Sequence, residues 1–156
     1  AALGNRAGLR QAKGDLDGAI EDFTRYLDED PRSSRFLSAR GIARSLKGDE
    51  SGALADFEAA IAADPGCHVA FAERGILRKN AGDLDGAIED YTEALRIEPG
   101  MVEARINRGL TLVERGEFDG AVSDFTAALD AASPDWPLRA QVEKWRDAAR
   151  SMSGRR

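Results

Sequence analysis

Apolar residues recur along the chain at the three- and four-residue spacing of amphipathic helices, and short turn signals separate the helical segments. In the third such stretch this pattern predicts one helix from about His68 to Ala81 and a second from Asp85 to about Ile97, which Pro99 ends. The Gly82-Asp83 pair makes a short turn, and short turns place consecutive helices antiparallel. The chain is therefore predicted to be all-α and built from helix pairs.

The pattern returns every 34 residues in four copies. Four positions keep one chemical type in every copy, namely Gly14, Gly48, Gly82 and Gly116; Ala19, Ala53, Ala87 and Ala121; Phe23, Phe57, Tyr91 and Phe125; Leu27, Ile61, Leu95 and Leu129. Prolines keep the register in the first three copies and come one residue late in the fourth, at Pro134. The expected repeats span residues 1–33, 34–67, 68–101 and 102–134.

Small residues stand in the middle of the first helices, at Gly41, Gly75 and Gly109, with Ala7 in the first copy. Glycine inside a helix costs about 0.5–1 kcal/mol relative to alanine unless a close approach requires it. We expect this glycine column to face the alanine column of the second helices where paired helices cross. The aromatic column is expected to fill the space between adjacent copies, so that no copy buries its apolar face alone.

These residues resemble the tetratricopeptide repeat (TPR) family, whose signature has 34 residues, the Ala-x3-aromatic motif seen at Ala19 and Phe23, the mid-helix glycine and the closing proline. The resemblance covers residues 1–134 and implies a right-handed superhelical solenoid of four antiparallel helix pairs that binds proteins. Two departures are arginine columns where the family usually has Leu and Tyr: Arg6, Arg40, Arg74 and Arg108; Arg10, Arg44 and Arg78, with Leu112 in the fourth copy. They are similar to a bacterial subgroup whose repeats read Asn-Arg-Gly in the first helix.

Aspartates repeat in step with the first arginine column, at Asp22, Asp56, Asp90 and Asp124. Both signs recurring in register favour a ladder of bidentate Arg–Asp pairs that replaces part of an apolar contact. The alternative is a basic surface for an acidic ligand, which would not need a matching aspartate column.

Composition changes after the fourth copy, where both tryptophans, Trp136 and Trp145, occur. The spacing of Leu138, Val142 and Trp145 predicts an amphipathic helix over about 137–150, so residues 135–150 are expected to be a C-terminal capping helix on the last repeat. A tryptophan-lined partner site is the alternative. Residues 151–156 are expected to form a disordered polar tail.

The TPR resemblance also implies a groove lined by the first helices, which receives an extended peptide or a helix of a partner protein. Its two rows would be Gly4, Ser38, Ala72 and Ile106, then Gly8, Ile42, Ile76 and Leu110, with a mixed-charge rim of Arg35, Glu73, Lys79, Asn80, Glu103, Asn107 and Glu114. The second row is apolar, and an exposed apolar stripe indicates a surface that something covers. A TPR subclass clamps chaperone C-termini with Lys and Asn, and here those positions hold Gly4, Gly8, Ala39, Val69 and Glu73.

Composition excludes several other functions. A net charge of -6 argues against nucleic acid as a partner, and no apolar run is long enough to insert in a membrane. One cysteine and one histidine, the neighbours Cys67 and His68, make neither a disulfide nor a metal site, and adjacent residues rarely form a nucleophile and base pair. We therefore expect no enzyme, cofactor or metal, and the compartment, cytoplasm or periplasm, stays open.

Two functions remain. The first is an adaptor that holds a peptide or helical segment of a partner protein in the groove, through Ser38, Ile42, Ala72, Glu73, Ile76, Lys79, Asn80, Ile106, Asn107 and Leu110. The second is a structural module that forms a homo-oligomer through the same groove or an exposed repeat edge, or whose groove is covered by a preceding segment of chain. Neither the partner nor the pathway can be identified from the residues, because this fold serves many unrelated roles.

Overall fold

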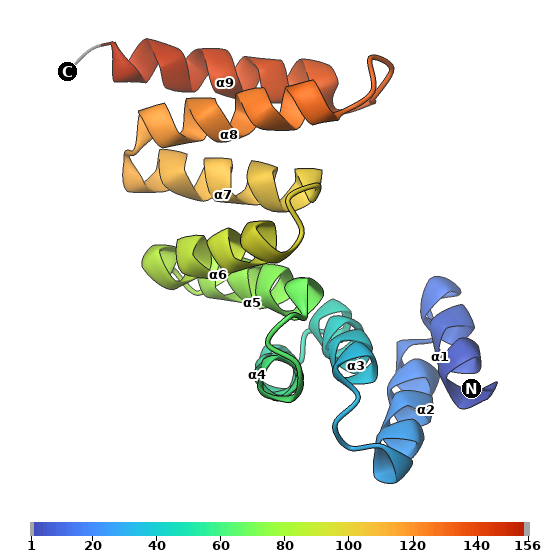
Figure 1. The fold of residues 1–156 in the computed structure, drawn as a ribbon. Coiled ribbons are helices and arrows are strands. Elements are labelled where there is room, and N and C mark those ends of the chain that lie inside the picture. Colours follow the sequence, from blue (N-terminus) through green and yellow to red (C-terminus); the bar gives the residue numbers. More distant parts are fainter. Residues whose placement is uncertain (1, 155–156) are drawn as a thin grey trace. The chain divides into compact units, whose positions relative to one another are not determined.

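The computed structural model describes residues 2–154, and in that part it contains nine helices and no strand. The helices are α1 (Ala2–Ala12), α2 (Leu16–Glu29), α3 (Ser34–Lys47), α4 (Glu50–Ala63), α5 (His68–Asn80), α6 (Leu84–Ile97), α7 (Val102–Arg115), α8 (Phe118–Ala131) and α9 (Arg139–Ser153) (Figure 1). The predicted helices of the third copy agree with α5 and α6 to within one residue. The chain divides into two compact units, residues 1–77 and 78–156, which we describe separately.

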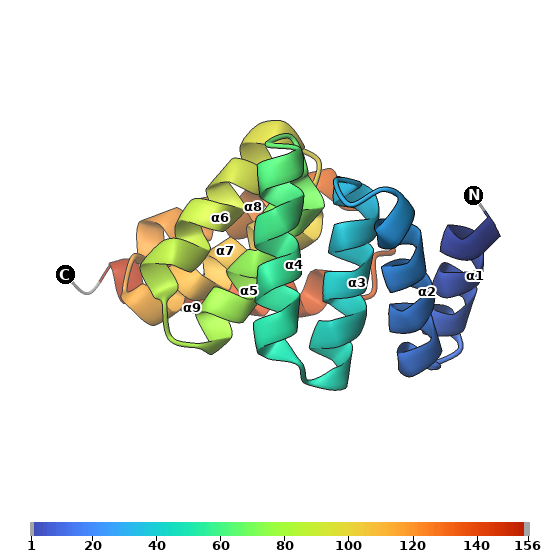
Figure 2. The same ribbon diagram turned by 90° about the horizontal axis from the view of Figure 1, so that it is seen from below.

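Each turn inside a helix pair is built by a glycine and, in three copies, by the aspartate that follows it. Gly14, Gly48, Gly82 and Gly116 have φ angles of 82°, 88°, 85° and 83°, a left-handed conformation that side chains disfavour. Asp15, Asp49 and Asp83 then begin the next helix, and each carboxylate accepts a hydrogen bond from the backbone N–H three residues on. In the fourth copy Glu117 stands at this place without such a bond. The antiparallel pair that results is seen for α3 and α4 in Figure 2.

The mid-helix glycines face the aromatic ring of their own pair. A Cβ atom at Gly41 would lie 2.6 Å from the Phe57 ring, and one at Gly109 would lie 2.8 Å from the Phe125 ring. Ala53 and Ala121 are fully buried in the same cores, and the expected contact between the glycine and alanine columns stays a prediction. The contact between glycine and ring was not predicted from the sequence. The physical reason is size, since only a residue without a side chain lets a flat ring lie against the helix backbone.

The aromatic column also reaches the neighbouring copy. In the first unit the ring centroids of Phe23 and Phe36 are 6.1 Å apart, which joins α2 to α3. In the second unit Phe125 lies 6.2 Å from Trp145, which joins α8 to α9. The rings thus pack inside their own helix pair and also fill the space between that pair and the next helix.

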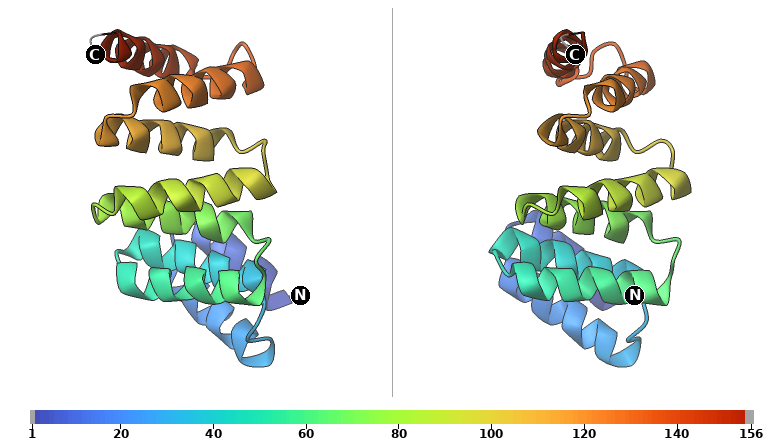
Figure 3. Two further views of the ribbon diagram at one scale, coloured as in Figure 1. Left: turned by 60° about the vertical axis from the view of Figure 1, so that its left-hand side comes forward. Right: turned by 90° about the vertical axis from the view of Figure 1, so that its left-hand side faces the viewer.

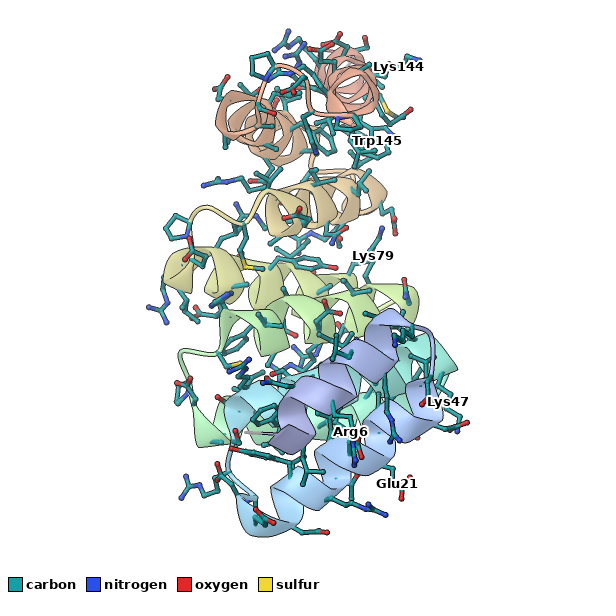
Figure 4. The ribbon with its side chains drawn as sticks, turned by 90° about the vertical axis from the view of Figure 1, so that its right-hand side faces the viewer. Arg6, Glu21, Lys47, Lys79, Lys144 and Trp145 are labelled. Atoms are coloured by element: carbon teal, nitrogen blue, oxygen red, sulfur yellow. The ribbon has the colours of Figure 1, made fainter. Side chains whose placement is uncertain are left out.

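The C-terminal helix covers the last repeat, as the spacing of its apolar residues predicts. Helix α9 packs along α8 (Figure 3), where Val142 is fully buried and Trp145 lies against the same core. Figure 4 shows Trp145 on the side of α9 toward the other helices and Lys144 on the outer side. The helix continues to Ser153, so three residues expected to belong to a disordered tail are helical. Residues 155–156 of that expected tail lie outside the described part of the chain.

The same polar contacts between adjacent copies occur in both units, two repeat lengths apart along the sequence. In the first unit Arg40 Nη1 donates to Thr24 Oγ1 at 3.2 Å, and in the second unit Arg108 Nη1 donates to Thr92 Oγ1 at 3.0 Å. The ion pairs of Lys47 with Asp17 and of Arg115 with Asp85 repeat in the same way. Helices α3 and α7 are therefore each held on the preceding second helix by one hydroxyl contact and one ion pair.

Candidate functional site

The Arg–Asp ladder is present within both units. Arg6, Arg40 and Arg108 each donate two hydrogen bonds through Nε and Nη2 to one carboxylate, at distances of 2.6–2.9 Å to Asp22, Asp56 and Asp124. The ladder prediction is confirmed for these three pairs. The guanidinium groups are committed to buried carboxylates, so a free basic surface does not form along this column.

A second arginine joins the ladder, and sequence reasoning did not assign it this role. Arg10, Arg44 and Arg78 place Nη1 at 3.0 Å, 2.8 Å and 3.1 Å from Asp22, Asp56 and Asp90. The same nitrogen donates to the backbone carbonyl of Gly18, Gly52 or Gly86. The signal was the recurrence of arginine at every copy but the fourth, where Leu112 takes its place.

The contacts of Asp22 with Arg6 and Arg10 explain the ionisation of its carboxyl group. The hydrogen bond from Arg6 lowers the pKa of the Asp22 carboxyl, with a further contribution from the charge of Arg10. Asp22 is thus held ionised in a buried position, as a structural anion that links α1 to α2. Arg6 stands at the junction of these helices in Figure 4.

The first predicted groove row is mostly covered. Ser38, Ala72 and Ile106 are 3%, 8% and 7% exposed. Ser38 donates to the Ser34 carbonyl at 2.8 Å and lies 3.3 Å from Cys67 Sγ. Surface that a ligand could contact comes instead from the second row, in which Ile42, Ile76 and Leu110 are half-buried and Gly8 is exposed.

An apolar hollow opens beside Ile42 in the first unit. Its volume is about 370 Å³, and its walls are Ser34, Arg35, Ser38, Ala39 and Ile42 of α3, with Asp64, Cys67, His68 and Val69 of the following turn and α5. The two predicted groove residues of α3, Ser38 and Ile42, are therefore brought together here. A concave apolar surface with a few polar groups at its edge is the usual form of a binding site.

A second hollow lies on the other side of Arg35. It measures about 470 Å³ and is lined by Gly4, Asn5, Gly8 and Leu9 of α1 together with Arg35. The Arg35 guanidinium lies 5.3 Å from the Phe36 ring centroid, and no carboxylate in the described part of the chain pairs with it. Arg35 is thus a cation placed between two open hollows.

Glu73, also predicted for the groove, is a half-buried carboxylate of α5. Burial raises the pKa of its side chain, and among residues 2–154 it has no ion-pair partner. A ligand group that donates a hydrogen bond or carries positive charge would relieve this cost.

In the second unit the predicted rim residues lie at the end of α5 and along α7. Lys79 Nζ forms an ion pair with Glu114 at 3.0 Å, so these two rim charges neutralise each other. Asn80 and Glu103 are exposed, and Asn107 is half-buried next to Leu110 on α7. The backbone carbonyl of Asn107 accepts a hydrogen bond from Thr111 at 2.7 Å, which leaves its side-chain amide available.

No described group of three or more His, Cys, Asp or Glu side chains could hold a metal ion. Cys67 and His68 line the apolar hollow, where Cys67 contacts Ser38. Within residues 2–154 no helix is long and apolar enough to cross a membrane.

Comparison with known proteins identifies the repeat. The tetratricopeptide repeat family model matches residues 5–66 and 73–135. A search of curated proteins found no match. Among solved structures, a crystal structure of MamA is 20% identical, with 95% of this chain and 94% of that chain aligned at a TM-score of 0.74, and a second MamA structure (AMB-1 P212121) is 19% identical, with 99% and 82% aligned at 0.80.

Another similar structure is the first TPR of Spaghetti (RPAP3) bound to the HSP90 peptide SRMEEVD, which is 24% identical, with 73% of this chain and 90% of that chain aligned at a TM-score of 0.70. At these identities the structures show a shared fold, the TPR helical solenoid. TPR proteins are in general interaction scaffolds without catalytic activity, and no catalytic family is indicated. With the family model matching most of its length, the chain belongs to the tetratricopeptide repeat family and is a protein-interaction module.

Proposed function

We propose that this chain is an adaptor that holds a segment of a partner protein on the surface formed by its first helices. The observation that carries the proposal is the apolar hollow of about 370 Å³ between α3 and the start of α5. Ala39, Ile42 and Val69 leave apolar surface open there, and folding gains nothing from apolar surface that stays in water. An apolar side chain of a partner segment would bury that surface.

The charges around the hollow suggest what else the segment carries. Arg35 is the unpaired cation at its edge, so a carboxylate of the partner would gain a charge-assisted hydrogen bond there. Gly8 has open space above it, which allows the backbone of an extended segment to approach α1 closely. The favoured ligand is therefore a segment with an apolar anchor and a nearby acidic residue.

A C-terminal carboxylate is not the favoured anchor. The structure of the first TPR of Spaghetti (RPAP3) contains an HSP90 peptide, SRMEEVD. In this chain the positions of the chaperone clamp hold Gly4, Gly8, Ala39, Val69 and Glu73, none of which is a cation or an amide side chain. An internal segment of the partner therefore fits these residues better than a free chain end.

Self-association through the groove or an exposed repeat edge is the second candidate. Leu9 and Leu46 are each 64% exposed on α1 and α3, and exposed leucines can join copies of one chain as well as bind a partner. The two candidates differ in stoichiometry and in their dependence on protein concentration.

The test is selection of binding peptides from a displayed random library, with three proteins as bait. These are the parent chain, Val69→Glu in the hollow, and Ala59→Glu on an exposed position of α4, which adds the same charge elsewhere. We expect the parent and Ala59→Glu to select peptides with an apolar and an acidic residue, and Val69→Glu to select none of them. Selection of the same peptides by all three proteins would contradict the proposal.

A further inference from the structure

The fourth copy lacks a guanidinium group that the other copies hold on the ladder. In the second copy Arg44 donates through Nη1 to Asp56 Oδ2 at 2.8 Å and to the Gly52 carbonyl at 3.3 Å. Leu112 stands at the equivalent position of the fourth copy. Among the described residues Asp124 Oδ2 therefore has one hydrogen-bond donor, whereas Asp56 Oδ2 has two.

Leu112 takes the place of the arginine stem and leaves the place of the guanidinium open. A Cβ atom added at Gly86 would lie 3.1 Å from Arg78 Cδ, and one added at Gly120 would lie 3.2 Å from Leu112 Cδ1. The leucine methyl group thus corresponds to the last carbon of the arginine stem, and the leucine side chain ends there. The planar group that follows this carbon in arginine has no counterpart in Leu112.

A hollow of about 310 Å³ opens at this point in the second unit. Its walls include Ile88 of α6, Leu112 of α7, and Gly120, Ser123 and Asp124 of α8. Ser123 is exposed, and the Asp124 side chain is 6% exposed. We call this space the fourth-copy hollow. It is lined by the residues whose equivalents bind a guanidinium in the other copies.

The charges around the hollow point to the same missing group. In the second copy three cations pair with three carboxylates, which are Arg40, Arg44 and Lys47 with Asp17, Asp49 and Asp56. In the fourth copy the described residues provide two cations for three carboxylates, which are Arg108 and Arg115 with Asp85, Glu117 and Asp124. The fourth-copy hollow is therefore one positive charge short, and a cation that enters it is attracted.

We infer that the fourth-copy hollow receives the guanidinium group of an arginine side chain from a partner protein. That group would donate to Asp124 Oδ2 and to the Gly120 carbonyl, as Arg44 does at the equivalent acceptors of its own copy. A lysine ammonium is a compact point charge and lacks the flat fork that these repeats bind. Ile88 and Leu112 offer apolar contact to the arginine stem.

The charges favour an arginine within a protein chain over the free amino acid. The α-carboxylate of free arginine needs a cation, and both nearby cations, Arg108 and Arg115, are already paired. An arginine inside a chain has no such carboxylate. The fourth-copy hollow shares no lining residue with the hollow of α3 and α5, so this inference does not rest on the proposed adaptor function.

The test is a titration of the full isotope-labelled chain with N-acetyl-arginine amide, followed by NMR at constant ionic strength. We expect a Kd of roughly 1–10 mM, because the probe is small, with shift changes at the backbone amides of Gly120 and Asp124. N-acetyl-lysine amide should bind at least about fivefold more weakly. Free arginine should bind no more tightly than its blocked amide.

Three variants test whether the probe binds in the hollow. Leu112→Arg fills the hollow with a guanidinium of the chain itself, as Arg44 does in the second copy, and should abolish binding. Ser123→Lys puts a positive charge at the exposed edge and should weaken binding about threefold or more. Ala55→Lys is the matched control, because it adds the same charge at the equivalent exposed position of the second copy, where the ladder is complete. It should leave binding unchanged, and circular dichroism checks that each variant is folded.

Several results would overturn the inference. They are the absence of shift changes at Gly120 and Asp124, equal affinity for the arginine and lysine amides, and binding that survives in a folded Leu112→Arg. Equal weakening by Ser123→Lys and Ala55→Lys would show a general effect of charge. Free arginine that binds about tenfold more tightly than the amide would make the ligand a small molecule. A chain that is a dimer in light scattering, and that Leu112→Arg makes a monomer, would make the ligand an arginine of a second copy.

Discussion

Gly41 and Phe57 are packed so closely that the glycine has no room for a side chain: a Cβ atom there would lie 2.6 Å from the ring. Phe57 is fully buried, so it cannot turn away. This relationship explains why a residue that weakens helices stands in the middle of α3.

Gly41→Ala should therefore destabilise the protein by about 1–3 kcal/mol, because the ring or the helix must shift. Gly8→Ala is the control, since nothing lies within 4 Å of its added methyl group and alanine favours helix by about 0.5–1 kcal/mol. Urea unfolding followed by circular dichroism measures both changes. Equal effects of the two substitutions would mean that the close packing at Gly41 is absent.

The ladder makes a second prediction, because Asp124 pairs with one arginine whereas Asp22 and Asp56 each pair with two. Arg108→Leu leaves the buried carboxylate of Asp124 without an ion pair, whereas Arg40→Leu leaves Arg44 in place at Asp56. We expect a loss of about 3 kcal/mol or more for Arg108→Leu and a clearly smaller loss for Arg40→Leu. Adding Asp124→Leu to Arg108→Leu should recover part of the stability in the same unfolding assay, and strictly additive losses would contradict the pairing.

Glu73 gives a prediction about pH. Its pKa is raised by burial, so the folded state holds the proton more tightly than the unfolded state does, and ionisation destabilises the fold. The destabilisation by ionisation of Glu73 is therefore absent at a pH well below the ordinary pKa of 4.5. It appears as the pH rises through the raised pKa. Glu73→Gln should therefore raise the melting temperature at pH 7 and change it little at pH 3.5. A substitution that lowers stability at pH 7 would show that the carboxylate has a stabilising partner.

Much of the fold could be predicted from the sequence, because each residue type that repeats in every copy meets one structural requirement of the repeat. Gly48 indicates a left-handed turn and Asp49 indicates the start of a helix, and both can be recognised without knowledge of the packing. Which columns meet depends on how paired helices cross, and no residue type specifies that. For this reason the contact between Gly41 and Phe57 was not predicted from the sequence.

The candidate site was harder to predict than the fold. The sequence placed Ser38 and Ile42 on one surface, and both line the hollow. Rotation of α3 about its axis decides which row is open, and it buries Ser38 while leaving Ile42 half-buried. Arg35 was expected at the rim, yet its position between two hollows depends on the neighbouring helix and could not be read from its own repeat.

The most direct measurement of the adaptor proposal is the affinity of one selected peptide for the parent chain, Val69→Glu and Ala59→Glu, by fluorescence anisotropy, with the molar mass of each protein from light scattering. We expect a Kd of about 1 µM, equivalent to roughly -8 kcal/mol, for the parent chain and for Ala59→Glu. Binding to Val69→Glu should be at least about tenfold weaker, with unchanged helical circular dichroism. Equal affinity for all three proteins, or a Val69→Glu variant that keeps the peptide and changes only from dimer to monomer, would contradict it.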